Sequence, residues 1–393
     1  MTSSQQPPPS TERPLRILLA NSHFKGYGQP TVVRLLARAL ADQGHAVLVA
    51  CPPGSELMQR CADEGIATFT GARFKKTNRL VSTACDIATL RRLMAEWKPD
   101  IIHSNGSQDT WSLAMAKWRG GFAAPHVMTR HNTKRVNLGI ANRWLYGKRL
   151  AHLVLAADAV RASYQPHLDV GVLTTSRITA IHPPFDDRAY AQPIDRNAVR
   201  VAAGIPDGEP IVGVVARLEA CKGHRYLLDA FPAVLAQVAK AHLVVLGDGS
   251  AEAELRAQSS ALGFADRVHW LGYRRDAAKL TAGFDVDVLP SSAEASPTVV
   301  KEAMSVGVPC VATGVGGTVE LLRDGVDGFV VPPADPQALA ERIIRLLRDP
   351  ELAARFGAAA RQRVWAQFAP SACARFHSAL YHALLPVHDW PSG

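Results

Sequence analysis

Short apolar runs alternate with longer amphipathic stretches along the first half of the chain. The amphipathic stretches carry apolar residues at helical spacing and lie at residues 31–43, 85–97, 109–117 and 140–149. The apolar runs have the length of buried strands and lie at residues 15–20, 47–51, 101–103, 127–129, 153–156 and 178–181. Because strands that alternate with helices build parallel sheets covered on both faces, the pattern predicts an α/β domain over residues 15–185.

A linker-like segment, His182-Pro-Pro-Phe-Asp-Asp187, interrupts this alternation. Strand-like runs then resume at residues 211–216, 242–247, 268–271, 286–289, 308–313 and 328–331. Helical patterns separate them at residues 225–238, 252–262, 297–306, 319–323 and 337–347. A second α/β domain is therefore predicted over residues 186–368. Ligands of parallel sheets bind beyond the carboxyl ends of the strands, so two facing sheets would place the site in the cleft between the domains.

Both ends of the chain fall outside these two domains. Residues 1–14 are polar and rich in proline, and we expect a disordered tail without the apolar core of a secretory signal. Residues 369–393 contain one more helical pattern, at 371–385, and the sequence leaves open whether this helix crosses back to the first domain. No stretch approaches the roughly 20 apolar residues of a membrane-spanning helix.

Cysteine and histidine spacing gives no sign of a disulfide framework or a metal site. The six cysteines are scattered without a CxxC pair, which favours buried, reduced thiols in a cytoplasmic protein. The histidines form no HExxH or HxxxH pair, so no metal is expected.

The chain is basic, with a formal net charge of +9. This excess favours a polyanionic partner, but no nucleic-acid-binding module is recognisable, so no nucleic acid is expected. Residues 130–149 carry six Lys or Arg residues and no acid, together with Trp144 and Tyr146. Two interpretations stay open for this segment: a solvated basic face, or a surface that meets an anionic membrane or a phosphorylated acceptor.

Two glutamates, Glu294 and Glu302, lie eight residues apart after the apolar run at 286–289. The pattern predicts a strand, an acidic loop and a helix with Ser296 as its N-cap and Pro297 at its first position. The amides of Thr298 and Val299 would then point into the loop and bind an anion. Carboxylates on each side of such a nest suit the hydroxyls of a sugar nucleotide.

Two cations follow the run at 211–216. Arg217 would lie at its carboxyl end and Lys222 in the next loop, a spacing that suits a diphosphate or, alternatively, two surface charges. The turn Gly247-Asp-Gly249 is predicted to lie under a nucleotide, with a plain turn as the alternative. Glycines at 314, 316 and 317 form a further loop that allows close approach of a ligand.

The first half offers weaker candidates. The loop at residues 21–28, which contains Gly26 and Gly28, could cover a phosphate or a sugar. His131 comes just past the run at 127–129, and His103 and Asp109 flank the end of another. Each of these three side chains has packing or simple surface exposure as its alternative.

Taken together, these motifs resemble glycosyltransferase family 4. The resemblance is carried by Arg217 with Lys222-Gly223, by Gly247-Asp-Gly249, by Glu294 and Glu302 with Glu-Ala-Met304, and by the glycine loop that precedes Glu320. It is strongest over residues 211–347 and thinner in the first domain, which looks most like bacterial transferases of lipopolysaccharide and other surface glycans. It implies the GT-B fold, in which two Rossmann-like domains face each other across a cleft.

The resemblance also implies roles for individual residues. Arg217 and Lys222 would neutralise the donor diphosphate, Glu294 would lie near the donor sugar and Glu302 would bind the ribose hydroxyls. His131 would contact the donor sugar near its reacting carbon. Fixed cations and helix N-termini would replace a divalent metal, so neither a metal nor another cofactor is expected.

The implied activity is transfer of a hexose or heptose from a nucleotide diphosphate to a hydroxyl of a glycan or glycolipid, with retention of configuration. The expected location is the cytoplasm or the inner face of the cytoplasmic membrane. The chain departs from the family pattern in three places. Ala295-Ser-Pro297 stands where Gly-Phe-Gly is frequent, Pro183-Pro-Phe185 stands where Pro-Asn-Gly is usual, and Gly26-Tyr-Gly28 replaces an adjacent glycine pair. A sugar-nucleotide 2-epimerase of the same two-domain form is the alternative enzyme.

Overall fold

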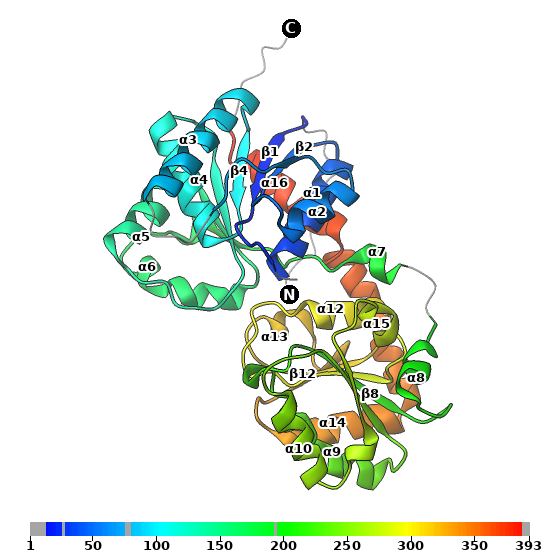
Figure 1. Ribbon diagram of the computed structural model, residues 1–393. Coiled ribbons are helices and arrows are strands. Elements are labelled where there is room, and N and C mark those ends of the chain that lie inside the picture. Colours follow the sequence, from blue (N-terminus) through cyan, green and yellow to red (C-terminus); the bar gives the residue numbers. More distant parts are fainter. Residues whose placement is uncertain (1–12, 26–27, 75–79, 192–194, 387–393) are drawn as a thin grey trace. The chain divides into compact units, whose positions relative to one another are not determined.

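The computed structural model describes residues 13–25, 28–74, 80–191 and 195–386. Gly26 and most of the N-terminal tail lie outside these ranges. The chain divides into two compact units: the first comprises residues 1–184 and 370–393, and the second comprises residues 185–369 (Figure 1).

The described part of the first unit holds a seven-stranded parallel sheet in the order β3-β2-β1-β4-β5-β6-β7. The strands are β1 Arg16–Ala20, β2 Ala46–Ala50, β3 Thr68–Phe69, β4 Ile101–Ser104, β5 His126–Arg130, β6 His152–Leu155 and β7 Ile178–Ala180. The α-helices are α1 Gly28–Asp42, α2 Glu56–Asp63, α3 Leu80–Trp97, α4 Ser107–Gly120, α5 Ile140–Trp144, α6 Gln165–Asp169 and α16 Pro370–Ala383. Shorter helical turns are Leu145–Arg149 (π), Asp158–Tyr164 (3-10) and Thr175–Arg177 (3-10).

Strand β1 shows why the apolar runs are continuous. Ile17 and Leu19 pack in one cluster with α1 and α16, whereas Leu18 and Ala20 pack in another with α3 and α4. Successive side chains of a strand point to opposite faces, so a strand covered on both faces needs apolar residues throughout.

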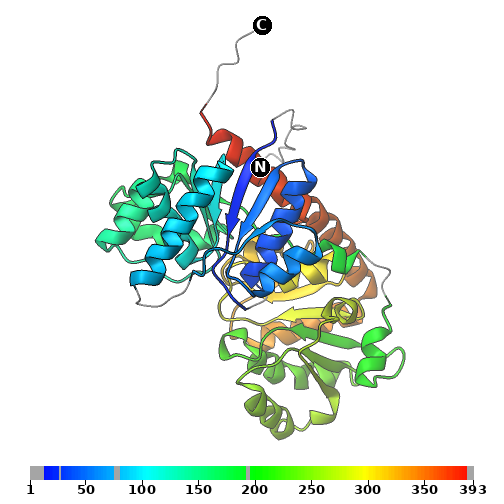
Figure 2. The same cartoon turned by 45° about the horizontal axis from the view of Figure 1, so that its top comes forward.

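Helix α16 completes the first unit from the far end of the chain. It lies beside α1 (Figure 1, Figure 2), and Ala374 and Tyr381 are fully buried in the cluster that contains Ile17. The helix is thus part of the core of this unit, although the sequence left its position open.

The described part of the second unit holds a six-stranded parallel sheet in the order β10-β9-β8-β11-β12-β13. The strands are β8 Ile211–Val215, β9 His242–Leu246, β10 Val268–Gly272, β11 Val286–Leu289, β12 Cys310–Thr313 and β13 Gly328–Val331. The α-helices are α7 Asp187–Tyr190, α8 Ala198–Ala203, α9 His224–Gln237, α10 Glu252–Ala261, α11 Ala277–Thr281, α12 Thr298–Ser305, α13 Thr318–Leu321, α14 Pro336–Arg348 and α15 Pro350–Gln367. Two 3-10 turns, Ala220–Lys222 and Ala265–Arg267, complete the set.

The sequence prediction of the helices needs correction at α5, which is shorter than predicted, and at α15, which was not predicted. The helix expected at 140–149 is α-helical only to Trp144 and continues as a π turn. The sequence reading also missed α15, although its start carries a clear signal. The side chain of Asp349 accepts a hydrogen bond from the amide of Leu352 (2.9 Å), and Pro350 occupies the first helical position.

Buried histidines make the first unit acid-sensitive. Burial lowers the pKa of His126 to about 3 and the pKa values of His152 and His377 to about 4. His377 also stacks on buried His103, with ring centroids 5.5 Å apart, so α16 meets the sheet partly through neutral imidazoles.

We therefore expect the free energy of unfolding of the first unit, which holds these histidines, to fall as the pH is lowered from 7.5 to 5. The folded-state pKa values lie below the ordinary value of 6.5, so the unfolded chain binds more protons in this window. The contribution of these groups is complete above pH 6.5 and is lost toward pH 4, by about 2 kcal/mol at pH 5 for each of His126, His152 and His377. Urea unfolding at the two pH values tests this. The variant His377→Phe should show a weaker pH dependence of the first unit, and the same pH dependence in variant and wild type would contradict the argument.

Candidate functional site

Three loops meet at the carboxyl edge of the second sheet. They follow β8, β11 and β12, which are neighbours in the sheet. The amide and hydroxyl of Ser292 donate to the carbonyl of Cys221 (2.9 and 3.2 Å), and the amide of Gly317 donates to the carbonyl of Ala295 (3.0 Å). These bonds hold the loop of Lys222, the acidic loop and the glycine loop together, at the edge where parallel sheets bind their ligands.

A lysine and a glutamate form the charged centre of this edge. Lys222 Nζ lies 2.7 Å from Glu294 Oε1, and Ser291 Oγ donates to the same oxygen at 2.7 Å. The Glu294 side chain is only 9% exposed, whereas that of Lys222 is 21% exposed. The lysine thus presents a partly open cation, and the carboxylate is held in one orientation by two donors.

Arg217 lies apart from this pair. Its guanidinium pairs with Glu219, and its side chain is 69% exposed. The sequence predicted that Arg217 and Lys222 would grip one diphosphate together. In the structure only Lys222 contacts the acidic loop, and the diphosphate contact of Arg217 stays a prediction.

The turn Gly247-Asp-Gly249 packs under the loop that carries Arg217. A Cβ at Gly247, whose φ is +142°, would lie 2.0 Å from the carbonyl oxygen of Ala216, and one at Gly249 would lie 2.4 Å from that of Leu218. The amide of Leu218 donates to the carbonyl of Asp248 at 2.8 Å. The glycines are therefore required for backbone packing, and their contact with a nucleotide stays a prediction.

The start of α12 differs from the expected one. The helix begins at Thr298 with an extended Pro297 as its N-cap, so the prediction of a Ser296 cap with Pro297 inside the helix was wrong. The hydroxyl of Ser296 instead accepts from the fully buried ammonium of Lys301 at 3.4 Å. Thr298 and Val299 are half-buried and begin the first turn of α12, where backbone amides lack partners within the helix.

Glu302 lies near a second acidic side chain, that of Asp287, which the sequence analysis did not include in the site. Burial raises the pKa of Glu302 to about 7, opposed by a hydrogen bond from Tyr190. Burial and the nearby charge of Glu302 raise the pKa of Asp287 to about 8. Both carboxyls therefore keep a proton to a higher pH than exposed acids do. The sequence signal that could have identified this pair was Asp287, a charged residue inside the otherwise apolar run Val286–Leu289.

In the first unit, the carboxyl ends of β4 and β5 bring His131 to Asn105. His131 Nε2 lies 3.1 Å from Asn105 Oδ1. His103 is fully buried and is hydrogen-bonded to Tyr381 and Thr129, so the packing alternative holds for it. Gly28 begins α1 at an exposed position, and its predicted partner Gly26 lies outside the described residues.

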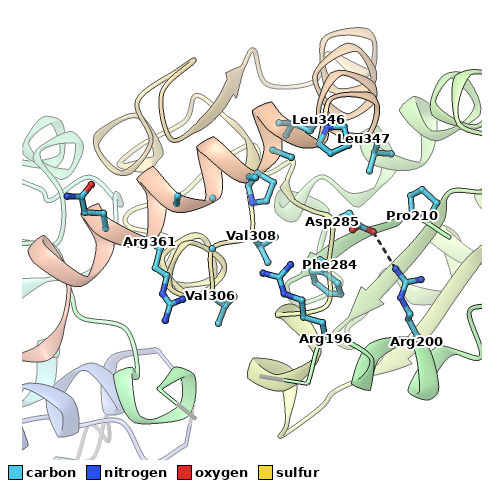
Figure 3. Close-up of a pocket in the computed structure, with 18 of the residues that line it drawn as sticks. Arg196, Arg200, Pro210, Phe284, Asp285, Val306, Val308, Leu346, Leu347 and Arg361 are labelled. Atoms are coloured by element: carbon cyan, nitrogen blue, oxygen red, sulfur yellow. Dashed lines mark ion pairs between the residues drawn. The ribbon is translucent and has the colours of Figure 1, made fainter. Parts of the chain in front are cut away.

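Each unit also contains a hollow in its surface. One, of about 520 Å³, lies at the carboxyl edge of the first sheet, and its lining includes Phe24, Arg73 and Phe74. The other, of about 960 Å³, lies in the second unit, where Arg200 is paired with Asp285 (Figure 3). Because Pro210, Asp285 and Pro309 precede their strands, this hollow opens at the amino edge of the sheet, opposite to Lys222.

In the residues that the structure describes, no group of three or more His, Cys, Asp or Glu side chains could hold a metal ion. No helix within the same ranges is long and apolar enough to span a membrane.

Comparison with known proteins assigns the family. Residues 195–363 match the profile described as glycosyl transferases group 1, and residues 27–188 match the one described as glycosyltransferase family 4. The chain is 31% identical over 286 residues to the D-inositol 3-phosphate glycosyltransferase of Xylanimonas cellulosilytica, a match that covers 67% of each chain. It is 30% identical over 208 residues to the N-acetyl-alpha-D-glucosaminyl L-malate synthase of Bacillus anthracis. This second match covers 53% of the present chain and spans about half of the relative's length (54%).

Solved structures agree with this assignment at the level of the fold. A glycosyltransferase from Rickettsia africae has a TM-score of 0.83 at 19% identity, covering 96% of this chain and all of that one. Anabaena Alr3699/HepE, solved in complex with UDP, has a TM-score of 0.79 at 23% identity, covering 94% and 100%. The two parallel sheets are those of a GT-B enzyme. The chain belongs to glycosyltransferase family 4 and is a glycosyltransferase.

Proposed function

We propose that the protein transfers a hexose or heptose from a nucleotide diphosphate sugar to a hydroxyl of an anionic glycan or glycolipid, with retention of the anomeric configuration. The observation that carries this proposal is the pair of Lys222 and Glu294 at the carboxyl edge of the second sheet. A partly exposed cation beside an oriented carboxylate suits a sugar that is joined to a pyrophosphate.

Each group at this edge has one task in the proposal. Lys222 and the first amides of α12, those of Thr298 and Val299, stabilise the charge that develops on the leaving pyrophosphate. Glu294 accepts hydrogen bonds from hydroxyls of the donor sugar, and Glu302 accepts them from the ribose. Arg217 and His131 take the roles that the family resemblance implies, at the diphosphate and at the donor sugar.

The chemical step breaks the bond between the anomeric carbon and the phosphate oxygen. The leaving phosphate oxygen takes the proton of the acceptor hydroxyl as that hydroxyl attacks from the same face. The nucleoside diphosphate departs with this proton, and the charges balance without a metal or a redox partner. The fixed cations supply the electrostatic stabilisation.

The acceptor proposal rests on charge and on the relatives. Two of the relatives that the chain matches are named for L-malate and D-inositol 3-phosphate, which are both anionic. Arg73 lines an apolar hollow at the carboxyl edge of the first sheet, which fits an acceptor with an anionic group. WaaG, a glycosyltransferase of lipopolysaccharide biosynthesis, shares the fold (TM-score 0.66, 19% identity), in keeping with a role in surface-glycan synthesis at the cytoplasmic face of a membrane.

The function is tested by incubating the protein with UDP-, GDP- and ADP-sugars and following thermal stabilisation. The stabilising donor is then offered with candidate anionic acceptors. The expected result is a glycosylated acceptor whose new bond has the donor's anomeric configuration, seen by NMR. An epimerised nucleotide sugar formed without an acceptor would instead identify a 2-epimerase, and inversion would refute the retaining mechanism.

We also propose that the protein binds anionic membranes through the surface formed by Ile140, Trp118 and Arg149. Ile140 is 89% exposed, Trp118 is 49% exposed, and the guanidinium of Arg149 lies 5.5 Å from the Trp118 ring and 4.8 Å from that of Trp144. Exposed apolar and aromatic side chains beside cations are typical of surfaces that bind anionic lipid.

We expect the protein to sediment with vesicles that contain phosphatidylserine and not with neutral ones. Ile140→Glu should reduce the bound fraction several-fold, since it places a like charge against the lipid phosphates. Val201→Glu is the matched control because Val201 is equally apolar and 82% exposed but lies in the second unit. Equal sedimentation with both kinds of vesicle would refute a lipid-binding surface.

A further inference from the structure

Asn105 connects the ends of two central strands of the first unit with the loop of His131. It follows β4, it is almost completely buried, and its backbone amide donates to the carbonyl of Ala20 in β1 at 3.1 Å. Its side-chain nitrogen Nδ2 donates to the same carbonyl at 3.2 Å. Its side-chain oxygen Oδ1 lies 3.1 Å from His131 Nε2.

These contacts fix which way the amide group of Asn105 faces. If the amide were flipped, Oδ1 would lie against the carbonyl oxygen of Ala20, and two acceptors would repel each other. The oxygen must therefore face His131. An amide oxygen only accepts, so the nitrogen Nε2 of a neutral His131 ring must carry the proton.

The surrounding loop keeps Asn105 in place. Asp109 is fully buried, and its Oδ2 accepts from the amides of Asn105 (2.8 Å) and Gly106 (2.9 Å). A Cβ on Gly106 would lie 2.4 Å from Asp109 Oδ1 and 2.6 Å from Ser22 Oγ. The loop is therefore packed around the carboxylate and cannot easily shift, which gives Asp109 a structural reason to be buried.

We propose that Asn105 is a positioning residue that holds His131 as the Nε2-protonated tautomer, so that Nδ1 is the nitrogen that accepts a hydrogen bond from a hydroxyl of the donor sugar. The tautomer follows from the geometry of the first unit alone, whereas its use in sugar binding rests on the proposed function. A histidine nitrogen that only accepts selects a hydroxyl and rejects a deoxy or O-methyl group at that position, because neither can donate.

The tautomer can be measured directly by NMR on the full chain labelled with ¹⁵N-histidine. Long-range ¹H–¹⁵N correlations of the ring distinguish the two nitrogens, and His131→Gln identifies the signals of His131. We expect Nε2 to be protonated and Nδ1 to be unprotonated at pH 7.5. A ring that is mainly Nδ1-protonated would overturn the proposal, whatever the enzyme's activity.

The variant Asn105→Leu removes the acceptor while keeping a side chain of similar size. We expect its His131 ring to show a mixture of tautomers and its kcat/KM for the donor to fall about tenfold, the usual effect of one lost hydrogen bond. Melting temperatures separate this effect from unfolding. Asn137→Leu, at an exposed position of the same loop, is the control and should change neither quantity. An unchanged tautomer in Asn105→Leu would refute the role of Asn105, whereas the expected tautomer without transfer from any nucleotide sugar would refute only the proposed function.

Discussion

Replacing Lys222 by alanine is expected to lower kcat for sugar transfer by about 100- to 1,000-fold, the range found when one preorganised charge-stabilising donor is removed from an active site. The negative charge of the leaving nucleoside diphosphate grows as the bond to the sugar breaks. Lys222 is the cation that the structure places against the acidic loop, 2.7 Å from Glu294. Because its contribution increases toward the transition state, kcat should fall more than donor affinity.

The same substitution also changes the unliganded protein. Glu294 would keep its bond from Ser291 but lose its ion-pair partner at a position that is 9% exposed. Removing one member of a buried pair leaves an uncompensated charge, so the melting temperature should fall as well. The double variant Lys222→Ala/Glu294→Gln restores neutrality. It should recover stability and stay inactive, which separates the two effects.

Lys240→Ala is the matched control for the loss of a positive charge. Lys240 pairs with Glu209 at 3.5 Å, and its side chain is 76% exposed, so removing it should leave kcat within about twofold and stability within about 0.5 kcal/mol. Steady-state kinetics with the donor identified by the thermal screen provides the measurement. Near-normal turnover of Lys222→Ala would remove the main support for the proposed site.

Much of the fold could be predicted because its signals are local. Strands buried on both faces need apolar residues throughout, and this requirement is visible in the run Ile211–Val215 and, interrupted only by Asp287, in Val286–Leu289. The position of the acidic loop after that strand follows from the same pattern. Short elements such as α2 and β3 carry too few residues for a periodicity to be recognised, and they were missed.

Side-chain partners are harder to predict because they depend on the order of strands in the sheet and on turn geometry. Asn105 reaches Ala20 and His131 only because β4 lies between β1 and β5. Likewise, the turn after β8 directs Arg217 to Glu219 and Lys222 to Glu294, although both cations follow the same strand. Neither set of contacts can be inferred from the spacing of these residues along the chain.

The buried groups near α12 show the same limit. Ser296 looked like an N-cap, but its hydroxyl is used by Lys301, a lysine whose burial no local pattern indicates. Asp287 was visible as a polar residue in an apolar strand, yet its proximity to Glu302 depends on how α12 packs on β11.

Replacing Gly316 by alanine is expected to lower kcat through the acidic loop, although it removes none of the side chains proposed to bind the donor. Gly316 has a φ of +53°, and a Cβ there would lie 1.7 Å from the carbonyl oxygen of Glu294. That distance is far inside van der Waals contact with a backbone atom, so the loop must move. A displacement of about 1 Å in a catalytic group can cost about 100-fold in rate.

Gly325→Ala provides a matched control for backbone strain. Gly325 has a φ of +73°, and no atom lies within 4 Å of a Cβ built there. Both variants place alanine in the left-handed region, at a cost of about 1–2 kcal/mol, but only Gly316→Ala adds a collision with the backbone of Glu294. Urea unfolding and kcat should therefore show a small loss of stability with normal turnover for Gly325→Ala, and a larger loss with at least tenfold lower kcat for Gly316→Ala. If the two variants had the same turnover, the position of the Glu294 loop would not control catalysis, and the contact between the glycine loop and the acidic loop would be only structural.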